Sequence, residues 1–355
     1  MDYLTDKWGN PSSAHAFGLR AKIGLDHARR GVANLVGAEP DMVVFTGSAT
    51  EANNTAILSA LRAAPQKRRI VTASTEHSAV ITMGRSQESA GYELILIPPL
   101  ASGLVDLQAL AAGINADTAI VSIMWANNET GVINPVAQVS SLCRERGVLF
   151  HCDAVQAAGK VPIDLRSVQV EYLTLSGHKI HGPKGVGALV VAPNAPFSPM
   201  LYGGHQENGR RGGTENVPAA VGFANAATVA TAELVNRCRQ VASLRDELES
   251  RVLAEISRTE IHGFGSPRLP NTSNIGFTGV DSDTLVALLD QRGVCVSSGS
   301  ACLSDAVAPS HVILAMTGSY QKASEAIRFS LSHHNTAAEI DYTVEAVKHA
   351  VAALR

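Results

Sequence analysis

Ser176-Gly177-His178-Lys179-Ile180-His181-Gly182-Pro183-Lys184-Gly185 is the stretch around which the chain is organised. The apolar runs at 171–175 and 186–191 predict short buried strands on either side, and glycine and proline mark the turn between them. Lys179 therefore stands at a strand end, where its amine can reach a cleft and form a Schiff base with a carbonyl compound. Taken alone, the stretch is more typical of a solvated basic loop.

The chain before this stretch alternates between strands and helices, which predicts a mostly parallel sheet with helices on both faces. We expect strands at 42–46, 69–72, 94–97, 119–125 and 148–153, with helices at 52–64, 78–90, 106–112 and 135–146. In such sheets, ligands bind beyond the carboxyl ends of the strands.

Polar residues follow the strands of this predicted sheet. They are Thr50, His77, Asn128, Asp153 and Lys179. Each alone would be a capping or turn residue, but together they indicate a site. A strand, a glycine turn and a helix start at 42–52 would make an anion site, since free N–H groups and the helix dipole favour negative charge, although by itself this pattern is more typical of an ordinary βα turn. A lysine in this setting is one way of tethering pyridoxal phosphate (PLP).

The second half of the chain predicts a smaller unit. A glycine-rich segment at 202–216 is either a functional loop or a mobile linker. The stretch 217–256 is helical, and we place a domain boundary within it near Glu233. Shorter strands at 274–277, 294–297 and 326–331 and helices at 281–292 and 336–354 follow. We expect a large domain at 12–233 and a small domain at 234–355 that includes residues 1–11.

Composition limits the possible functions. The 355 residues are 45% hydrophobic and carry a net charge of −3, so a basic field for nucleic acid is absent. The cysteines form no CxxC pair, which favours a reducing compartment. The sequence shows no signal peptide and no 18-residue apolar run, so we expect a cytoplasmic protein without a membrane partner. For Cys143, Cys152, Cys238 and Cys295 we expect buried, structural roles.

Several ordered motifs resemble those of the PLP-dependent cysteine desulfurases of the nitrogen-fixation (Nif) type, in the class V aminotransferase family. The resemblance runs from Gly9-Asn10-Pro11-Ser12-Ser13-Ala14-His15 to the C-terminal helix. The other motifs are Thr75-Glu76-His77, Trp125-Ala126-Asn127-Asn128-Glu129-Thr130-Gly131, His151-Cys152-Asp153, Ser176-Gly177-His178-Lys179, Gly209-Arg210-Arg211-Gly212-Gly213-Thr214, Ser297-Ser298-Gly299-Ser300-Ala301-Cys302 and Arg328-Phe329-Ser330-Leu331.

The resemblance implies the aspartate-aminotransferase-like α/β fold (fold type I) with PLP as cofactor. Lys179 would hold PLP as a Schiff base and then shuttle protons, Asp153 would pair with the pyridinium nitrogen, and His77 would stack on the ring. The other implied cofactor contacts are Gln156 at the ring hydroxyl, Asn128, and Thr50, Ala49, Ser176 and His178 around the phosphate. Thr214 matches a residue that reaches the phosphate in the partner subunit, which implies a homodimer.

The resemblance also implies the substrate and the nucleophile. Arg328 would clamp the carboxylate of L-cysteine together with Asn128, because a guanidinium matches two coplanar oxygens. Cys302 would attack the substrate sulfur as a thiolate and carry it as a persulfide. L-alanine would leave, and the sulfur would pass to an acceptor or iron–sulfur scaffold protein. No metal site is implied, although Cys302 could touch an iron–sulfur cluster transiently.

The chain departs from the family pattern at two places. The Asn-Ala-Thr-Thr-like run that usually precedes the Gly9 motif is not found, so we expect either a truncated start or an incomplete substrate pocket. The usual Thr-Ser-Gly-Ala-Thr turn reads Thr46-Gly47-Ser48-Ala49-Thr50, and we expect phosphate binding to survive. The alternatives are a selenocysteine lyase, or a weakly active PLP-binding scaffold protein.

Overall fold

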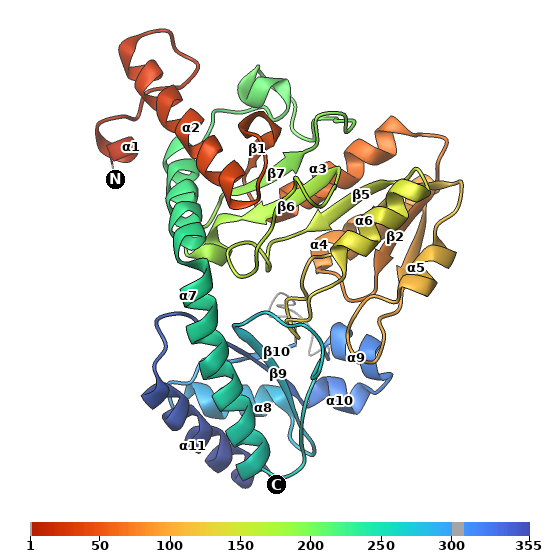
Figure 1. The fold of residues 1–355 in the computed structure, drawn as a ribbon, viewed down its shortest axis with the longest axis vertical. Coiled ribbons are helices and arrows are strands. Elements are labelled where there is room, and N and C mark those ends of the chain that lie inside the picture. Colours follow the sequence, from red (N-terminus) through yellow and green to blue (C-terminus); the bar gives the residue numbers. More distant parts are fainter. Residues whose placement is uncertain (1, 300–308) are drawn as a thin grey trace.

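The computed structural model describes residues 2–299 and 309–355, which form two sheets joined by one long helix (Figure 1). The larger sheet has the order β1-β7-β6-β5-β4-β2-β3. Its strands are β1 (Val43–Thr46), β2 (Arg69–Ala73), β3 (Glu93–Ile97), β4 (Thr118–Ser122), β5 (Leu149–Asp153), β6 (Tyr172–Ser176) and β7 (Gly187–Val191). The expected α/β architecture with a large, mostly parallel sheet is confirmed.

One strand runs against the others. β7 is antiparallel to both β6 and β1, whereas the remaining neighbours pair in parallel. The connection from β6 to β7 contains only a short 3₁₀ helix, Gly177–Ile180. Parallel pairing would need a crossover of a dozen or more residues, so this short connection returns the chain as a hairpin. The hairpin presents Lys179 at the end of β6.

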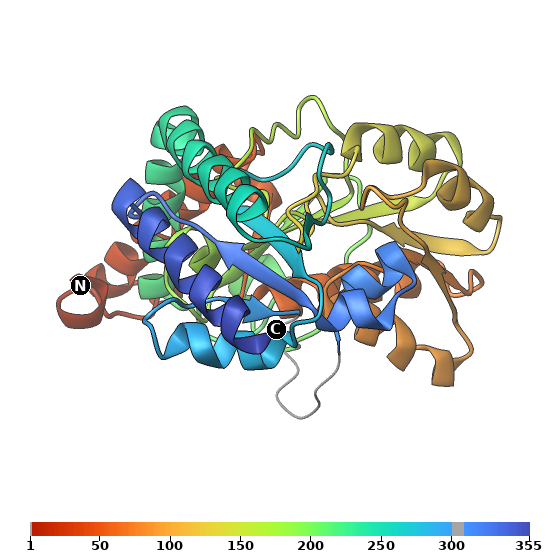
Figure 2. The ribbon, with the colours of Figure 1, turned by 90° about the horizontal axis from the view of Figure 1, so that it is seen from below.

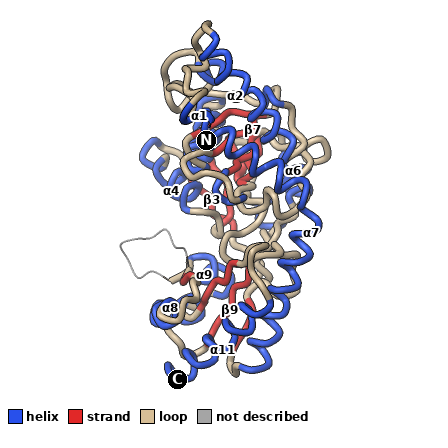
Figure 3. The backbone as a smooth tube through the Cα atoms, turned by 90° about the vertical axis from the view of Figure 1, so that its left-hand side faces the viewer, coloured by secondary structure: helices blue, strands red, loops and turns tan. Residues whose placement is uncertain are grey.

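Helices cover both faces of the large sheet. They are α2 (Ala16–Leu35), α3 (Ala49–Ala63), α4 (Ser78–Ser86), α5 (Leu107–Gly113) and α6 (Val136–Glu145). Figure 3 shows α4 and α6 on opposite sides of the strands. The core on one face includes residues of α2, α5 and α6, and the core on the other face includes residues of α3 and α4. The predicted helix 78–90 is interrupted, since α4 ends at Ser86 and a 3₁₀ turn covers Glu88–Ala90.

The sequence reading did not identify α2, although it packs extensively against the first half of α7. The sequence signal for this helix was a stripe of buried residues at helical spacing, namely Ala21, Leu25, Ala28 and Val32. Gly24 permits a close approach, because a Cβ at this position would lie 2.3 Å from the hydroxyl oxygen of Tyr3. Tyr3 thus packs on the large core, whereas we expected residues 1–11 to accompany the small domain.

The smaller sheet is antiparallel, in the order β10-β11-β9-β8. Its strands are β8 (Thr259–Ile261), β9 (Thr272–Phe277), β10 (Ser297–Ser298) and β11 (Ala326–Ser330). The remaining helices are α1 (Asp2–Thr5), α7 (Val217–Glu255), α8 (Ser282–Asp290), α9 (His311–Thr317), α10 (Tyr320–Ser324) and α11 (Ala337–Leu354). α7 and α11 pack side by side along this sheet (Figure 2).

The long helix α7 contributes to two separate cores. Ala227 and Ala230 belong to the core of the large sheet, and Val241 and Leu244 belong to the core of the small one. A boundary near Glu233, dividing 12–233 from 234–355, stays our proposal. Among the described residues, no helix is both long and apolar enough to cross a bilayer.

Candidate active site

A cavity of about 430 Å³ opens at the carboxyl-end edge of the large sheet. It brings together residues from strand ends, helix starts and both sheets. The predicted site residues that line it are Lys179, His77, Asp153, Gln156, Asn128, Thr50, Ala49, Ser176, His178 and Arg328. Thr214 is exposed and is not among its lining residues, and Cys302 lies outside the described residues.

Lys179 lies on the 3₁₀ helix that follows β6. Gly177, the first residue of this helix, is closely surrounded, because a Cβ there would lie 3.1 Å from the ring of Phe223 and 3.2 Å from the carbonyl of Pro183. Burial lowers the pKa of His77 and raises the pKa of Asp153, and in both cases the positive charge of Lys179 acts to lower the pKa. The amine is therefore within electrostatic reach of the imidazole and of the carboxylate across the cavity.

Asp153 is buried at the end of β5, with 6% of its surface exposed. Its Oδ2 accepts a hydrogen bond from Asn53 Nδ2 at 2.8 Å, and its Oδ1 accepts one from the N–H of Val155 at 2.9 Å. Burial raises the pKa of Asp153, although these hydrogen bonds and the charges of His77 and Lys179 oppose the increase. A carboxylate in this position favours a cationic N–H donor as its partner in the cavity.

His77 caps the N-terminus of α4. Its Nδ1 accepts a hydrogen bond from the N–H of Ala79 at 3.1 Å, so this nitrogen carries no proton and Nε2 carries it in the neutral ring. Burial is the main cause of the lowered pKa of His77; the charge of Asp153 opposes it, and the smaller effects of Lys179 and His311 act in the same direction as burial. His77 is thus a half-buried, neutral imidazole at the cavity wall.

The N-terminus of α3 forms another part of the wall. Ser48 is the N-cap, and Ala49 and Thr50 occupy the first turn, so their N–H groups face the cavity end of the helix. Gly187 of β7 allows this close packing, because a Cβ there would lie 2.8 Å from the nitrogen of Ala49. Together with Ser176 and His178, this arrangement fits an anionic group. Thr50 belongs to the helix itself, which starts earlier than predicted.

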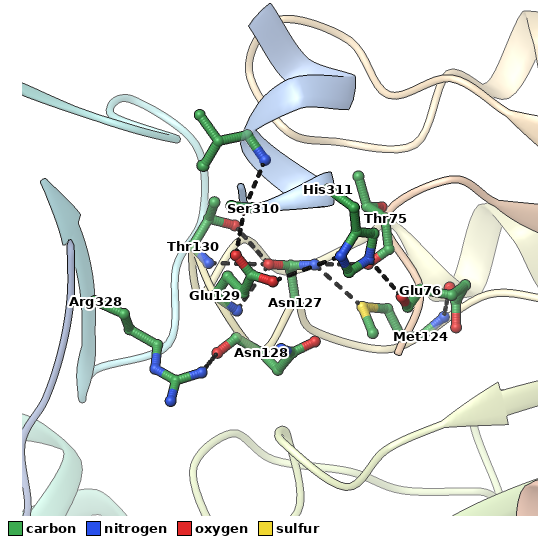
Figure 4. A network of polar contacts seen from close by, with 11 residues as sticks. Thr75, Glu76, Met124, Asn127, Asn128, Glu129, Thr130, Ser310, His311 and Arg328 are labelled. Carbon is green, nitrogen blue, oxygen red and sulfur yellow. Dashed lines mark hydrogen bonds and ion pairs between the residues drawn. The ribbon is translucent and has the colours of Figure 1, made fainter. Parts of the chain in front are cut away.

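Arg328 reaches from the small sheet to the large one. Its NH1 group donates to the carbonyl of Asn128 at 3.0 Å (Figure 4). Its NH2 group donates to Ser297 Oγ at 3.2 Å. Arg328 Nε and Asn128 Oδ1 are buried and have no hydrogen-bond partner among the described residues. The guanidinium therefore lines the cavity and is not a strand-edge group facing water.

Sequence reasoning missed a polar network beside this arginine, drawn in Figure 4. Asn127 Oδ1 accepts from the N–H groups of Glu129 and Thr130, both at 2.9 Å, and Asn127 Nδ2 donates to the carbonyl of Thr75. Glu76 Oε1 accepts from the N–H of Met124 at 2.6 Å. Acidic residues soon after apolar strands, as in Thr75-Glu76-His77 and Asn128-Glu129-Thr130, were the available signal.

The segment 202–216 is held in place by ion pairs. The Glu207 carboxylate accepts from both terminal nitrogens of Arg29 at 2.7 Å and from the N–H of Phe45 at 2.9 Å. Arg211 Nε donates to Glu51 Oε1 at 2.9 Å. The segment is therefore not a loosely attached linker.

The cysteines of the described residues are unpaired. Cys143 and Cys152 are buried as expected, and burial raises the pKa of both thiols, that of Cys143 to about 12. Cys238 is half-buried, with its thiol 3.0 Å from the carbonyl of Lys160. The expectation for Cys295 is wrong, because this residue is exposed. The predicted strand 294–297 is reduced to β10 at Ser297–Ser298, so Cys295 has no place in the small core.

Comparisons of the sequence and of the structure with known proteins identify the same group of relatives. Residues 1–343 match the family model described as aminotransferase class-V. A cysteine desulfurase of Nostoc sp. is 44% identical over 355 residues, which cover 100% of this chain and 89% of that protein. NifS, a cysteine desulfurase of Azotobacter vinelandii, is 43% identical over 356 residues, with the same coverage of 100% and 89%. A solved structure titled NifS-like protein superposes with a TM-score of 0.92 at 35% identity, covering 99% of this chain and 94% of that one.

Proposed function

Because this chain belongs to the class V aminotransferase family and, within it, to the NifS-type cysteine desulfurases, we propose that its cavity converts L-cysteine to L-alanine with PLP as cofactor. One observation carries the proposal: Lys179, Asp153 and His77 line a single cavity at the end of the sheet. An amine, a buried carboxylate and a neutral imidazole are the groups that a PLP enzyme of this kind requires.

The residues of the cavity fit PLP. Asp153 would pair with the ring nitrogen, since a buried carboxylate needs a cationic partner. The N–H groups at the start of α3 would hold the phosphate, with Thr50, Ser176 and His178. Gln156 would contact the ring hydroxyl, and the imidazole of His77 would stack on the ring. When bound, the cofactor would supply a carbonyl carbon and an electron-withdrawing ring.

The substrate would be oriented from the small sheet. Arg328 Nε is buried and lacks a partner among the described residues, so a carboxylate would satisfy a donor that is otherwise costly to bury. Asn128 Oδ1, also without a partner there, would accept from the substrate or the cofactor. Lys179 would then take the α-proton of cysteine, and His77 would donate or accept protons near the sulfur through Nε2.

Cys302 would carry out the sulfur transfer. Its thiolate would attack the substrate sulfur, so that an S–S bond forms while the Cβ–S bond of the substrate breaks. The electron pair of that bond stays with the substrate carbon, which takes up a proton and leaves as L-alanine. The persulfide on Cys302 then passes to a sulfur acceptor, and we propose an iron–sulfur scaffold protein in that role. A homodimer would bring Thr214 to the phosphate site of the partner subunit.

The test combines cofactor absorbance with product analysis. In Cys302→Ala, the visible absorbance of the cofactor should persist while alanine formation from L-cysteine falls to background. Cys295→Ala is the matched control, because this exposed thiol lies outside the cavity. Lys179→Ala should lose the visible band of the lysine-bound cofactor. Undiminished alanine formation in Cys302→Ala, or an unchanged spectrum in Lys179→Ala, would contradict the proposal. Parallel assays with selenocysteine separate a desulfurase from a selenocysteine lyase.

A further inference from the structure

The N-terminus of α9 contacts two loops of the large sheet, and the proposed mechanism gives these contacts no role. The first residue of α9 is His311, which follows the N-cap residue Ser310. The two loops follow β2 and β4, and they present His77 and Asn128 to the cavity. Figure 4 shows Ser310 and His311 beside these loops.

Ser310 contacts the loop after β4 through its hydroxyl group. Its Oγ donates a hydrogen bond to Oε2 of Glu129, the residue next to Asn128, and accepts one from the N–H of Ile313 at 3.0 Å. Glu129 is fully buried and Ser310 is only 1% exposed, so losing one partner would leave the other unsatisfied away from bulk water. The bond needs only an acceptor oxygen, which the carboxyl group offers in either charge state.

His311 contacts the loop after β2. Its Nε2 lies 3.0 Å from the backbone carbonyl of Glu76, the residue before His77. A carbonyl oxygen can only accept, so Nε2 donates this hydrogen bond, and the neutral ring with its proton on Nε2 is sufficient. Two consecutive residues of the chain therefore hold the direct neighbours of two cavity residues.

Hydrogen bonds inside the loops connect the held residues to the cavity wall. The N–H groups of Glu129 and Thr130 donate to Asn127 Oδ1, both at 2.9 Å. In the other loop, the N–H of Ala79 donates to His77 Nδ1 at 3.1 Å. Side chains of each loop also bond to the backbone of the other. The two loops therefore form one hydrogen-bonded unit, which α9 contacts at two points.

The other side of α9 is fixed to the small sheet. A separate apolar core joins α9, α10 and β11, and its members are Val312, Ile313, Met316, Ala323 and Ala326. Ala326 is the first residue of β11, the strand that also carries Arg328. Because close-packed cores resist small displacements, α9 links this strand firmly to the two loops.

We propose that Ser310 and His311 are positioning residues of the active site, which hold both loops at a fixed distance from the strand that carries Arg328. The inference rests on the proposed function for its catalytic meaning. In that function Arg328 and Asn128 orient the substrate carboxylate while His77 acts near the sulfur. The three side chains must therefore keep one mutual geometry, and a misplacement of about 1 Å can cost on the order of 100-fold in rate.

Amide hydrogen exchange in the full-length protein tests the contacts directly. Ser310→Gly removes the hydroxyl but keeps a residue that N-caps accept, and it should speed exchange of the Glu129 and Thr130 amides about fivefold or more. His311→Leu removes the ring N–H donor and should speed exchange of the Ala79 amide by a similar factor. Ser310→Thr and His311→Gln keep a hydroxyl and a side-chain N–H, and should stay within about twofold of the parent.

Two controls separate this effect from a general loss of stability. Ser319→Gly changes the N-cap of the neighbouring helix α10, where the hydroxyl accepts from the N–H of Lys322, and should leave the loop amides unchanged. The amide of Ile275 in β9 is the internal reference, because this residue is fully buried in the small core. Equal acceleration of the loop amides in Ser319→Gly, or of Ile275 in the Ser310 and His311 variants, would overturn the inference.

Steady-state kinetics give the second readout. Ser310→Gly should act mainly on the KM for L-cysteine, since Asn128 orients the substrate, and His311→Leu mainly on kcat, since His77 acts in the reaction, each by about tenfold. Ser310→Thr and His311→Gln should recover the parent values to within about threefold. Unchanged exchange in Ser310→Gly and His311→Leu, or losses that the conservative variants do not recover, would overturn the inference. Hydrogen exchange needs no turnover, so failure of the proposed function would show separately, as absence of alanine in the parent protein.

Discussion

Behind Asp153, the imidazole of His151 joins three strands of the large sheet. His151 is fully buried, and its Nδ1 and Nε2 lie 2.8 Å and 3.0 Å from the hydroxyl oxygens of Ser122 and Thr174. Either tautomer can satisfy both hydroxyls, but a charged ring would have no acidic hydrogen-bond partner among the described residues. Burial accordingly lowers the pKa of His151 to about 3. This side chain supports the strand end that presents Asp153.

We predict that His151 makes the free energy of unfolding depend on pH. Because the folded-state pKa of His151 lies below the unfolded value of about 6.5, the unfolded chain takes up the proton first as the pH falls. The contribution of His151 is thus complete above pH ~6.5 and declines by up to about 1.4 kcal/mol per pH unit below it. Urea unfolding of the parent and of His151→Gln at pH 7, 6 and 5 should show a smaller loss in the variant. If the free energy of unfolding fell by the same amount with pH in both proteins, the lowered pKa assigned to His151 would be contradicted.

At the scale of single residues, the sequence could predict much of the cavity wall. Thr50, His77, Asn128, Asp153 and Lys179 were placed at strand ends, and parallel strands deliver such ends to one edge. Their roles remain predictions, as does that of Cys302. The pairing of Glu129 with Ser310 and His311 could not be read from the chain, because it joins positions about 180 residues apart whose distance depends on how the two sheets meet.

At the scale of elements, the pattern of the sequence located most strands and helices within a few residues and indicated a mostly parallel sheet, but it did not show that β7 runs against its neighbours. The reversal of β7 depends on the short β6–β7 connection, and α2 was missed because two of the four residues in its stripe, Ala21 and Ala28, are alanine. The segment 202–216 illustrates the same limit. Its composition suggested either a functional loop or a linker, and only the three-dimensional contacts of Glu207 with Arg29 and Phe45 show that it is anchored.

Glu207 therefore offers a prediction about this segment. Its side chain is 1% exposed and that of Arg29 is 13% exposed, so Glu207→Gln would leave a largely buried guanidinium without its counter-charge. We expect a loss of about 3 kcal/mol in the free energy of unfolding, together with faster proteolysis within 202–216. Asn208→Gly is the matched control, because its φ of 56° suits glycine and the change should stay within about 1 kcal/mol. Equal proteolysis rates in the two variants would contradict the anchoring role.

At the scale of the whole molecule, the two sheets are joined by more than α7. The segment 262–270 returns from the small sheet to the loop after β4, where Leu269 donates to the carbonyl of Gly131 and Ile133 donates to that of Pro267, both at 2.8 Å. Arg268 pairs with Val132 through an isolated β-bridge. This loop also carries Asn128 and Glu129, so the geometry of the cavity depends on how firmly the segment is held.

An ion pair between Arg268 and Glu249 of α7 holds that segment. Its nitrogen–oxygen distances are 2.6 Å and 2.8 Å, and the side chains are only 8% and 6% exposed. Arg268→Met leaves a buried carboxylate unpaired and should cost about 3–5 kcal/mol, whereas adding Glu249→Leu removes the stranded charge and should recover much of that loss. Urea unfolding of both single variants and the double variant gives the coupling free energy. In Arg268→Met, the amides of Ile133 and Leu269 should also exchange hydrogen faster, because their bonds join the two sheets. If the double variant were no more stable than the single ones, the pair would act through packing alone, and the link from α7 to the cavity loop would not be electrostatic.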